Sequence, residues 1–163
     1  MTCRTIARRC GAALALALSS TTAHAQASRD SVVATVQEFF RAMQGNDVAA
    51  SQRIMLADGQ LFASRPDADS LVVRRGTFAS HLERLRAARD TIIERMWDPA
   101  VTVHGDVATL TAPYDLYRNW TLSHCGVDAF TLLRGARGWL ITSVSYTVQP
   151  TGCAPSPLGT PKR

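Results

Sequence analysis

The sequence predicts an α+β domain in which helices lie against one face of a curved antiparallel sheet. The first half of the chain repeats apolar residues at three- and four-residue spacing, which is typical of amphipathic helices. From Thr91 onward, apolar and polar residues alternate in long segments instead. Turn residues separate these segments as in hairpins, and helices followed by a meander of strands favour the α+β class.

The first 25 residues are expected to be a signal peptide. A basic start with three arginines precedes an apolar run, Gly11–Leu18, that is too short to span a bilayer. Small residues around Ala25 fit a signal-peptidase site. We therefore expect cleavage near Ala25 and an exported protein, in the bacterial periplasm or outside the cell.

The remaining chain fits one domain, residues 26–150, followed by a proline-rich tail, residues 151–163. The domain is long enough to bury a core. The net charge of +5 falls to +2 when the signal peptide leaves, because it takes three arginines and no acid with it. This weakens the case for nucleic-acid binding. No later apolar run is long enough for a membrane span.

Helical periodicity dominates the first half of the domain. Phe39 and Phe40 belong to the apolar stripe of the first helix, and Thr77 is a plausible N-cap for the last. The expected elements are, in order, a helix at Ser31–Met43, a shorter helix from Asn46 or Asp47 to about Leu56, a strand at Gly59–Ser64, a loop at Arg65–Ser70, a strand at Leu71–Arg74 and a helix at Thr77–Arg89. We expect the arginines of the last helix, Arg84, Arg86 and Arg89, to face water rather than bind phosphate.

Four long strands are expected in the second half, at Thr91–His104, Asp106–Trp120, Leu122–Arg134 and Gly138–Gln149. Prolines prevent the tail from continuing the sheet. A long sheet curved around a helix leaves a cone with an open mouth, and small molecules bind in such mouths.

Two cysteines remain after removal of the signal peptide. Cys125 lies in an expected strand and Cys153 in the tail. An even pair in an exported protein predicts a disulfide, which would tie the tail to the sheet. The alternative is two free thiols.

The strand Ser123–Arg134 carries the best candidate site. His124 and Asp128 share one face because side chains alternate along a strand. They lie roughly 13 Å apart along an extended strand, so they could contact opposite ends of one small ligand, with Gly126 leaving room between them. Inside an apolar cone, Asp128 would have a raised pKa and act as an acid or hydrogen-bond donor. Alternatively, Asp128 accepts bonds from a helix end or an arginine, and His124 is exposed or bonded to a turn carbonyl.

Trp97 and Tyr114 are candidate pocket walls, with ordinary core packing as the alternative for each. Other chemistries lack their residues. The histidines do not have metal-ligand spacing, and there is neither a glycine-rich phosphate loop nor a nucleophile elbow around a serine. We expect no metal and no cofactor.

Several segments resemble the nuclear-transport-factor-2-like (NTF2-like), or SnoaL-like, superfamily. They are Val36–Asp47, Ala57-Asp58-Gly59, Gly105-Asp106-Val107-Ala108, and Val127-Asp128-Ala129-Phe130 with Gly138-Trp139-Leu140-Ile141. Pro113-Tyr114, His124-Cys125-Gly126 and the run from Tyr146 to Cys153 are similar to an exported subgroup of undefined function. The resemblance implies a cone-shaped α+β fold, and its members include isomerases, dehydratases, cyclases and non-catalytic binding domains, so the fold alone cannot give the function.

A residue-by-residue comparison with the ketosteroid isomerases of that superfamily is informative. Asp128 matches their acid that holds the oxyanion. Phe39 stands where they have a tyrosine, and Ser64 stands near their carboxylate base. Only one of the three roles is present, so we do not expect isomerase activity of that type.

The leading hypothesis is an exported domain that binds a small, partly apolar molecule with little or no catalysis. The first alternative is an enzyme of the isomerase, dehydratase or cyclase type that uses Asp128 with His124 or Tyr114. The second is an association module that forms homodimers and whose pocket is plugged by Trp97, Phe39 and Phe130.

Overall fold

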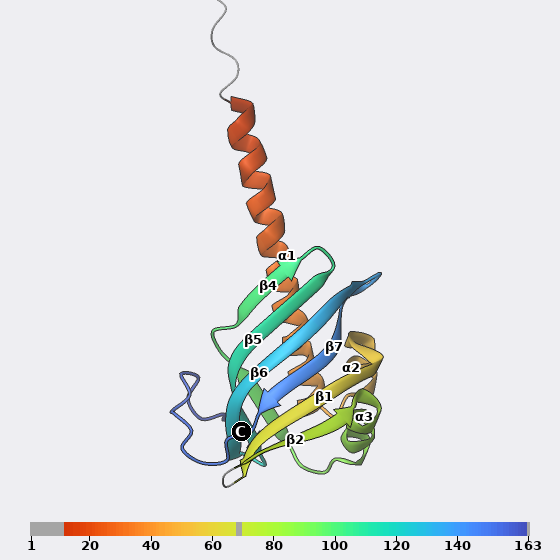
Figure 1. Ribbon diagram of the computed structural model, residues 1–163, viewed down its shortest axis with the longest axis vertical. Coiled ribbons are helices and arrows are strands. Elements are labelled where there is room, and N and C mark those ends of the chain that lie inside the picture. Colours follow the sequence, from red (N-terminus) through yellow and green to blue (C-terminus); the bar gives the residue numbers. More distant parts are fainter. Residues whose placement is uncertain (1–11, 68–69, 163) are drawn as a thin grey trace, which may run out of the picture.

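The computed structural model describes the backbone of residues 12–67 and 70–162, and the side chains of residues 25–66 and 70–162. Helices and a curved, open sheet form the fold, which confirms the predicted α+β class (Figure 1). The elements are α1 (Ala12–Gln44), α2 (Val48–Ile54), β1 (Met55–Asp67), β2 (Ser70–Thr77), α3 (Phe78–Ala87), β3 (Ile92–Met96), β4 (Ala100–His104), β5 (Val107–Arg118), β6 (Thr121–Gly135) and β7 (Gly138–Thr147).

The strand order in the sheet is β2-β1-β7-β6-β5-β3, and β4 also pairs with β5. All neighbouring strands are antiparallel except β1 and β7, which run parallel. The sheet is therefore mixed rather than wholly antiparallel. No hairpin joins β1 to β7, so nothing in the local connection requires these two strands to run in opposite directions.

The helix α1 packs its second half against the sheet. Its residues Val32, Val36, Phe39 and Phe40 are buried in the core, as their helical spacing predicts. The predicted helix at Ser31–Met43 is thus part of a longer helix. Figure 1 shows the earlier part of α1 extending away from the sheet. The expected signal peptide begins in residues 1–11, outside the described residues, and stays a prediction.

The two caps proposed for the later helices are present. The backbone N–H of Ala50 donates to Asp47 Oδ1 over 2.8 Å, so Asp47 caps α2. At α3, Ser80 N–H donates to Thr77 Oγ1 and Thr77 N–H donates to Ser80 Oγ, which forms a reciprocal capping box. The capping box fixes the start of α3, directly after the edge strand β2.

The strands differ from their predicted bounds at three main places. β1 begins at Met55 rather than Gly59, because α2 ends at Ile54 and not at about Leu56. The first hairpin is longer, because the expected loop at Arg65–Ser70 contributes paired residues to both strands, such as Arg65 opposite Val72. The predicted strand Thr91–His104 is broken at Trp97-Asp98-Pro99 into β3 and β4. Asp98 has a φ of 45° and Pro99 lacks a backbone N–H, so this segment cannot continue the ladder.

The tail crosses the outer face of the sheet. Cys125 and Cys153 lie at disulfide distance, as predicted, with their Cα atoms 5.9 Å apart. Farther along, Arg95 Nη2 donates to the Gly159 carbonyl over 2.7 Å. Because Arg95 pairs in register with Asp115, and Asp115 with Cys125, the anchors lie along one cross-strand row. We call residues Cys153–Gly159 the strap.

A buried ion pair lies beneath the strap. Arg95 donates from Nε to Asp115 Oδ1 over 2.9 Å and from Nη2 to Oδ2 over 2.5 Å. This bidentate geometry satisfies a carboxylate that is only 3% exposed. The ring of Tyr117 lies under the same guanidinium, 5.1 Å from its carbon.

No described helix is long and apolar enough to cross a membrane.

Candidate functional site

A cavity of about 640 Å³ opens between the concave face of the sheet and the helices α1 and α3. Its walls are apolar side chains such as Phe39, Leu61 and Phe130. The polar groups that line it include Asn46, His81, Glu94, His124, Asp128 and Tyr146, together with several arginines and Asp90. Phe39 and Phe130 form its walls and leave it open, while Trp97 is not among its lining residues. The plugged pocket assumed for an association module is therefore not found.

Two cross-strand rows bring the polar groups to the cavity. In the first row, Asp128 of β6 pairs with Tyr146 of β7, which pairs with Ala63 of β1. All three line the cavity. Directly paired residues point to the same face of a sheet, so this row positions a phenol beside a carboxyl.

The second row consists of Glu94 on β3, Leu116 on β5 and His124 on β6. These three residues also line the cavity. The rows belong to the same concave face, and the curvature of the sheet lets the long side chain of Glu94 reach toward Asp128. The carboxyl groups of Glu94 and Asp128 lie close enough to affect each other's pKa through a hydrogen bond when one of them is protonated.

Burial dominates the electrostatics of this acid pair. Asp128 is 2% exposed, and burial raises its pKa to about 7, partly offset by the hydrogen bond to Glu94. Burial also raises the pKa of Glu94 well above its usual range, and the charge of Asp128 and their hydrogen bond add to the effect. Among the described residues, no N–H or O–H group donates to Asp128 Oδ2. Because the pKa of each carboxyl is raised, one proton on the pair is favoured near neutral pH, and a protonated Glu94 is a donor within reach of Asp128.

His81 is a second polar group at the cavity, half-buried, with a buried Nε2 atom. Its ring stacks on Phe39 with a centroid distance of 5.4 Å, and within the described part of the chain its Nε2 atom has no hydrogen-bond partner. Burial lowers the pKa of His81 to about 4, and the charge of Arg84 lowers it further. The imidazole is therefore neutral at physiological pH and keeps one ring nitrogen free for a ligand or a water molecule.

The predicted site residues divide into two groups. Asp128 and His124 line the cavity, and burial followed by the charges of Arg118 and Arg65 lowers the pKa of His124. Tyr114 is fully buried behind the wall, where its hydroxyl donates to the Thr147 carbonyl over 2.8 Å. Trp97 lies in the turn between β3 and β4, away from the cavity, because the break in the strand interrupts the alternation on which its assignment depended.

The space expected above Gly126 is filled by the chain itself. A Cβ atom at this position would lie 2.1 Å from the Thr147 carbonyl oxygen. The glycine therefore allows the end of β7 to pass close over β6, and Val127 N–H donates to Thr147 Oγ1 over 2.9 Å at the same crossing. Gly126 has a packing role and leaves no room for a ligand.

Sequence reasoning missed Glu94, Tyr146 and His81 as site residues. Glu94 could have been predicted from the sequence, because it is a single carboxylate between the apolar residues Ile92 and Met96 on one face of the strand. Recognising the break before Pro99 would have isolated this short strand. The arginines of α3 are exposed, as expected, but Arg84 and Arg89 also border the cavity. The described residues contain no cluster of His, Cys, Asp and Glu side chains that could hold a metal ion.

The sequence matches no protein-family model and no curated protein. Solved structures nevertheless resemble the chain along most of its length. An NTF2-like protein with a cystatin-like fold from Novosphingobium aromaticivorans is 14% identical, with a TM-score of 0.62, covering 82% of this chain and 90% of that one. An NTF2-like protein from Cytophaga hutchinsonii is 14% identical, with a TM-score of 0.61, covering 74% and 97%. The chain has the NTF2-like fold.

A third structure with this fold is a candidate dehydratase of the NTF2-like family from Streptomyces avermitilis. It is 18% identical, with a TM-score of 0.58, and the alignment covers 78% of this chain and 99% of that one. The fold implied by the sequence resemblance is thus confirmed. At such identities the likeness concerns the fold and leaves the chemistry of the NTF2-like cavity to the residues that line it.

Proposed function

We propose that this NTF2-like chain binds a small, partly apolar molecule in the cavity. The observation that carries the proposal is a pair of neighbouring acids, Glu94 and Asp128, in the lining of a largely apolar cavity of about 640 Å³. This volume is within the range of small-molecule sites, which combine apolar walls with a few convergent polar groups.

The acid pair defines how the ligand is oriented. A protonated carboxyl can donate a hydrogen bond to a carbonyl or hydroxyl oxygen, and the buried position makes that bond strong. Tyr146, directly beside Asp128 in the sheet, and the neutral His81 offer further contacts. The expected ligand therefore has an apolar body and an oxygen acceptor that reaches the acid pair.

Binding is tested with phenylnaphthylamine, an uncharged apolar dye that fluoresces when it leaves water. We expect a saturable signal from the wild type. Ala63→Trp fills the cavity beside Tyr146 and should abolish the signal. Ser64→Trp, on the opposite face of the same strand, is the matched control and should retain it. Equal binding by both variants, with both shown to be folded by circular dichroism, would overturn the proposal.

A second candidate function is acid–base catalysis, for which the raised pKa of Asp128, about 7, is the supporting observation. A carboxyl that titrates near neutral pH can both accept and donate a proton. The candidate dehydratase among the structural neighbours is consistent with this chemistry. The test follows exchange of the α-proton of a panel of cyclic ketones in deuterated buffer by NMR. Exchange that requires both Asp128 and Glu94 would support an enzyme, and its absence would leave binding alone.

We also propose that the protein is exported. The supporting features are the arginines near the N-terminus, the apolar run Gly11–Leu18, the small residues around Ala25 and the cysteine pair. The test is the N-terminal sequence of the protein recovered from the periplasm or medium of its host. We expect it to begin at about Gln26. A protein that keeps residues 1–25 and stays in the cytoplasm would contradict export.

A further inference from the structure

We infer that the ligand is an amphipathic anion, whose apolar body occupies the cavity and whose carboxylate, or a similar single anionic group, lies at a ring of arginines around the mouth. This inference rests on the proposed binding function and specifies its ligand class. We call Arg65, Arg74, Arg84 and Arg89 the arginine rim. All four line the cavity, and they come from β1, β2, α3 and the segment that follows α3.

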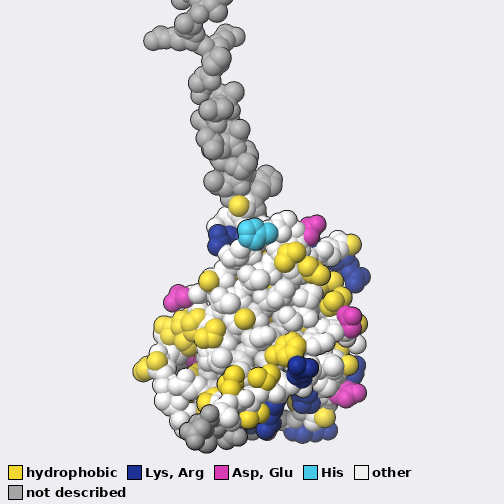
Figure 2. Space-filling view, viewed as in Figure 1, with side chains coloured by type: hydrophobic (Ala, Val, Ile, Leu, Met, Phe, Trp, Pro, Cys, Tyr) yellow, Lys and Arg dark blue, Asp and Glu magenta, His cyan; other side chains and the backbone are white. Residues whose placement is uncertain are grey.

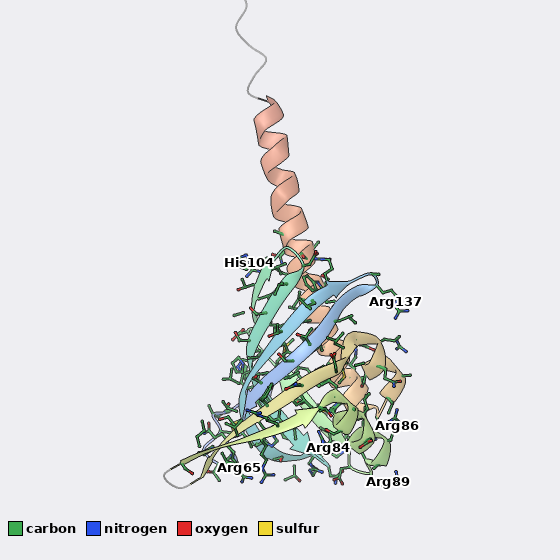
Figure 3. The ribbon with its side chains drawn as sticks, turned by 45° about the vertical axis from the view of Figure 1, so that its right-hand side comes forward. Arg65, Arg84, Arg86, Arg89, His104 and Arg137 are labelled. Carbon is green, nitrogen blue, oxygen red and sulfur yellow. A yellow bond between two sulfur atoms is a disulfide. The ribbon has the colours of Figure 1, made fainter. Side chains whose placement is uncertain are left out.

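The strands and the helix place the rim at the same opening. Arg74 pairs in register with Ala63, which lines the cavity, and Arg65 follows Ala63 by two residues on the same face. Arg84 and Arg89 come from α3 and its exit. Figure 3 shows Arg65, Arg84 and Arg89 at the same end of the molecule, and Figure 2 shows dark-blue side chains gathered at that end.

Among the described side chains, the rim arginines have no ion-pair partners. A fifth arginine at the mouth, Arg118, is bound to Asp90 over 2.6 Å. In residues 25–66 and 70–162, no carboxylate forms an ion pair with any of the four rim arginines. Within the same described residues, Arg84 donates only to Ser80 Oγ and Arg89 only to the Ala88 carbonyl, each over 3.3 Å. These guanidinium groups remain available to an anion.

The positive charge acts on the interior of the cavity. Burial is the main cause of the lowered pKa of both histidines, and the charge of Arg84 lowers that of His81 further, as the charges of Arg118 and then Arg65 do for His124. Both histidines line the cavity, so the rim favours negative charge inside it. The proton shared by Glu94 and Asp128 removes part of the negative charge that would repel an anion. A positive mouth over low-dielectric walls concentrates field lines and attracts anions.

The shape of the site distinguishes this ligand from a polyanion. Arginine binds carboxylates through a planar fork of N–H donors, which suits a single head group at the mouth. Leu61, Leu85 and Phe130 form apolar walls behind the rim, and a phosphate backbone would leave these walls without an apolar partner. An apolar tail attached to the head group would cover them.

The test compares two dyes that differ in one group. Anilinonaphthalene sulfonate carries an anionic group, and phenylnaphthylamine is the same molecule without it. The rim variant is Arg74→Gln with Arg84→Gln. The matched control is Arg86→Gln with Arg137→Gln, which removes the same charge from exposed arginines outside the cavity lining. Figure 3 shows Arg86 on the same helix as Arg84 and Arg137 at the other end of the sheet.

We expect the sulfonate dye to bind the wild type at least about tenfold more tightly than the uncharged dye at low salt, with the difference shrinking as salt is added. The rim variant should weaken the sulfonate dye about five- to tenfold and leave the uncharged dye within twofold. The control should change neither by more than about twofold.

The outcomes separate this inference from the proposed function. If the uncharged dye binds and Ala63→Trp abolishes its binding, but the sulfonate dye gains nothing from the rim, the cavity binds ligands and the anion inference is wrong. An equal loss in the control variant would show long-range charge attraction only, which also overturns it. If Ala63→Trp affects neither dye, the proposed function itself fails.

Discussion

The carboxyl groups of Glu94 and Asp128 lie close enough to raise or lower each other's pKa, although β5 separates their strands in the sheet. Such a contact requires a strongly curved sheet, because the rows that carry the two residues are four positions apart along β6. The curvature that forms the cavity therefore also forms the acid pair. Two carboxyls this close cannot both ionise without a large cost.

The first prediction concerns the pH dependence of stability. In the folded protein the pKa of Asp128 is about 7, well above its ordinary value of 3.8, so the folded state holds more protons between these pH values. The free energy of unfolding should therefore fall as the pH rises from about 4 to about 7. Asp128→Asn removes the ionisation and should be about 1–3 kcal/mol more stable than the wild type at pH 8, with little difference at pH 4.

Urea unfolding at the two pH values measures this effect. Glu83→Gln, which removes an exposed carboxylate on α3, is the control and should differ from the wild type by less than about 0.5 kcal/mol at both. An Asp128→Asn variant that is less stable than the wild type at pH 8 would show that the ionised carboxylate is satisfied in the folded state.

The second prediction concerns His81. Its folded-state pKa of about 4 is below the ordinary value of 6.5, so the unfolded state binds more protons between these values. His81 should therefore reduce the free energy of unfolding as the pH falls from about 6.5 to 4. His81→Phe keeps the stacking on Phe39 and removes this loss, so the variant should gain about 1–3 kcal/mol over the wild type at pH 4.5 relative to pH 7.5.

The difference between the two proteins isolates His81, because the acid pair contributes equally to both. His104→Phe, which changes an exposed histidine at the end of β4, is the control and should show no such pH-dependent gain. A constant difference between His81→Phe and the wild type across this range would mean that folding does not lower the pKa of His81.

The overall architecture was predictable because its signals are local. Helical spacing placed Val32, Val36 and Phe39 on one buried stripe, and alternation placed Leu110 and Phe130 on the concave side. Turn glycines and Thr77 fixed most boundaries. The direction of β1 beside β7 was not predictable, because this pairing joins distant segments without a hairpin.

The site was predictable only in part, because it depends on which strands meet. Alternation along β6 was sufficient to place His124 and Asp128 on one face. Their partners Glu94 and Tyr146 come from β3 and β7, and the register between these strands and β6 is a tertiary property. Trp97 was predicted to line the cavity because residues 91–104 were expected to form one continuous strand, whereas the strand breaks at Trp97-Asp98-Pro99.

The third prediction tests the close crossing at Gly126. Alanine at this position would place its Cβ atom 2.1 Å from the Thr147 carbonyl oxygen, and a backbone oxygen cannot rotate away as a side chain can. Gly126→Ala should reduce the free energy of unfolding by about 2 kcal/mol or more. Gly76→Ala is the matched control, since its nearest neighbour would be 3.7 Å away and the change should remain below about 1 kcal/mol. Urea unfolding measures both, and equal stabilities would show that the crossing relaxes freely.

The fourth prediction concerns the disulfide. Cys125→Ser with Cys153→Ser opens a loop with a sequence separation of 28, which should reduce the free energy of unfolding by about 3–4 kcal/mol in the chain-entropy model. Hydrogen exchange of the strap amides should become faster while exchange in β5 changes little. Wild-type protein treated with reductant should behave like the double variant, and a strap that stays protected in both would show that Arg95 holds it without the covalent bond.

The strap determines where the chain leaves the molecule. Its anchors, Cys125 and Arg95, lie on the outer face of the sheet, whereas the cavity lies on the concave face. A C-terminal tag therefore projects from the side opposite the concave face. Protein captured on a sensor surface through such a tag would keep the concave side of its sheet toward the solution, so immobilisation at this end suits binding measurements.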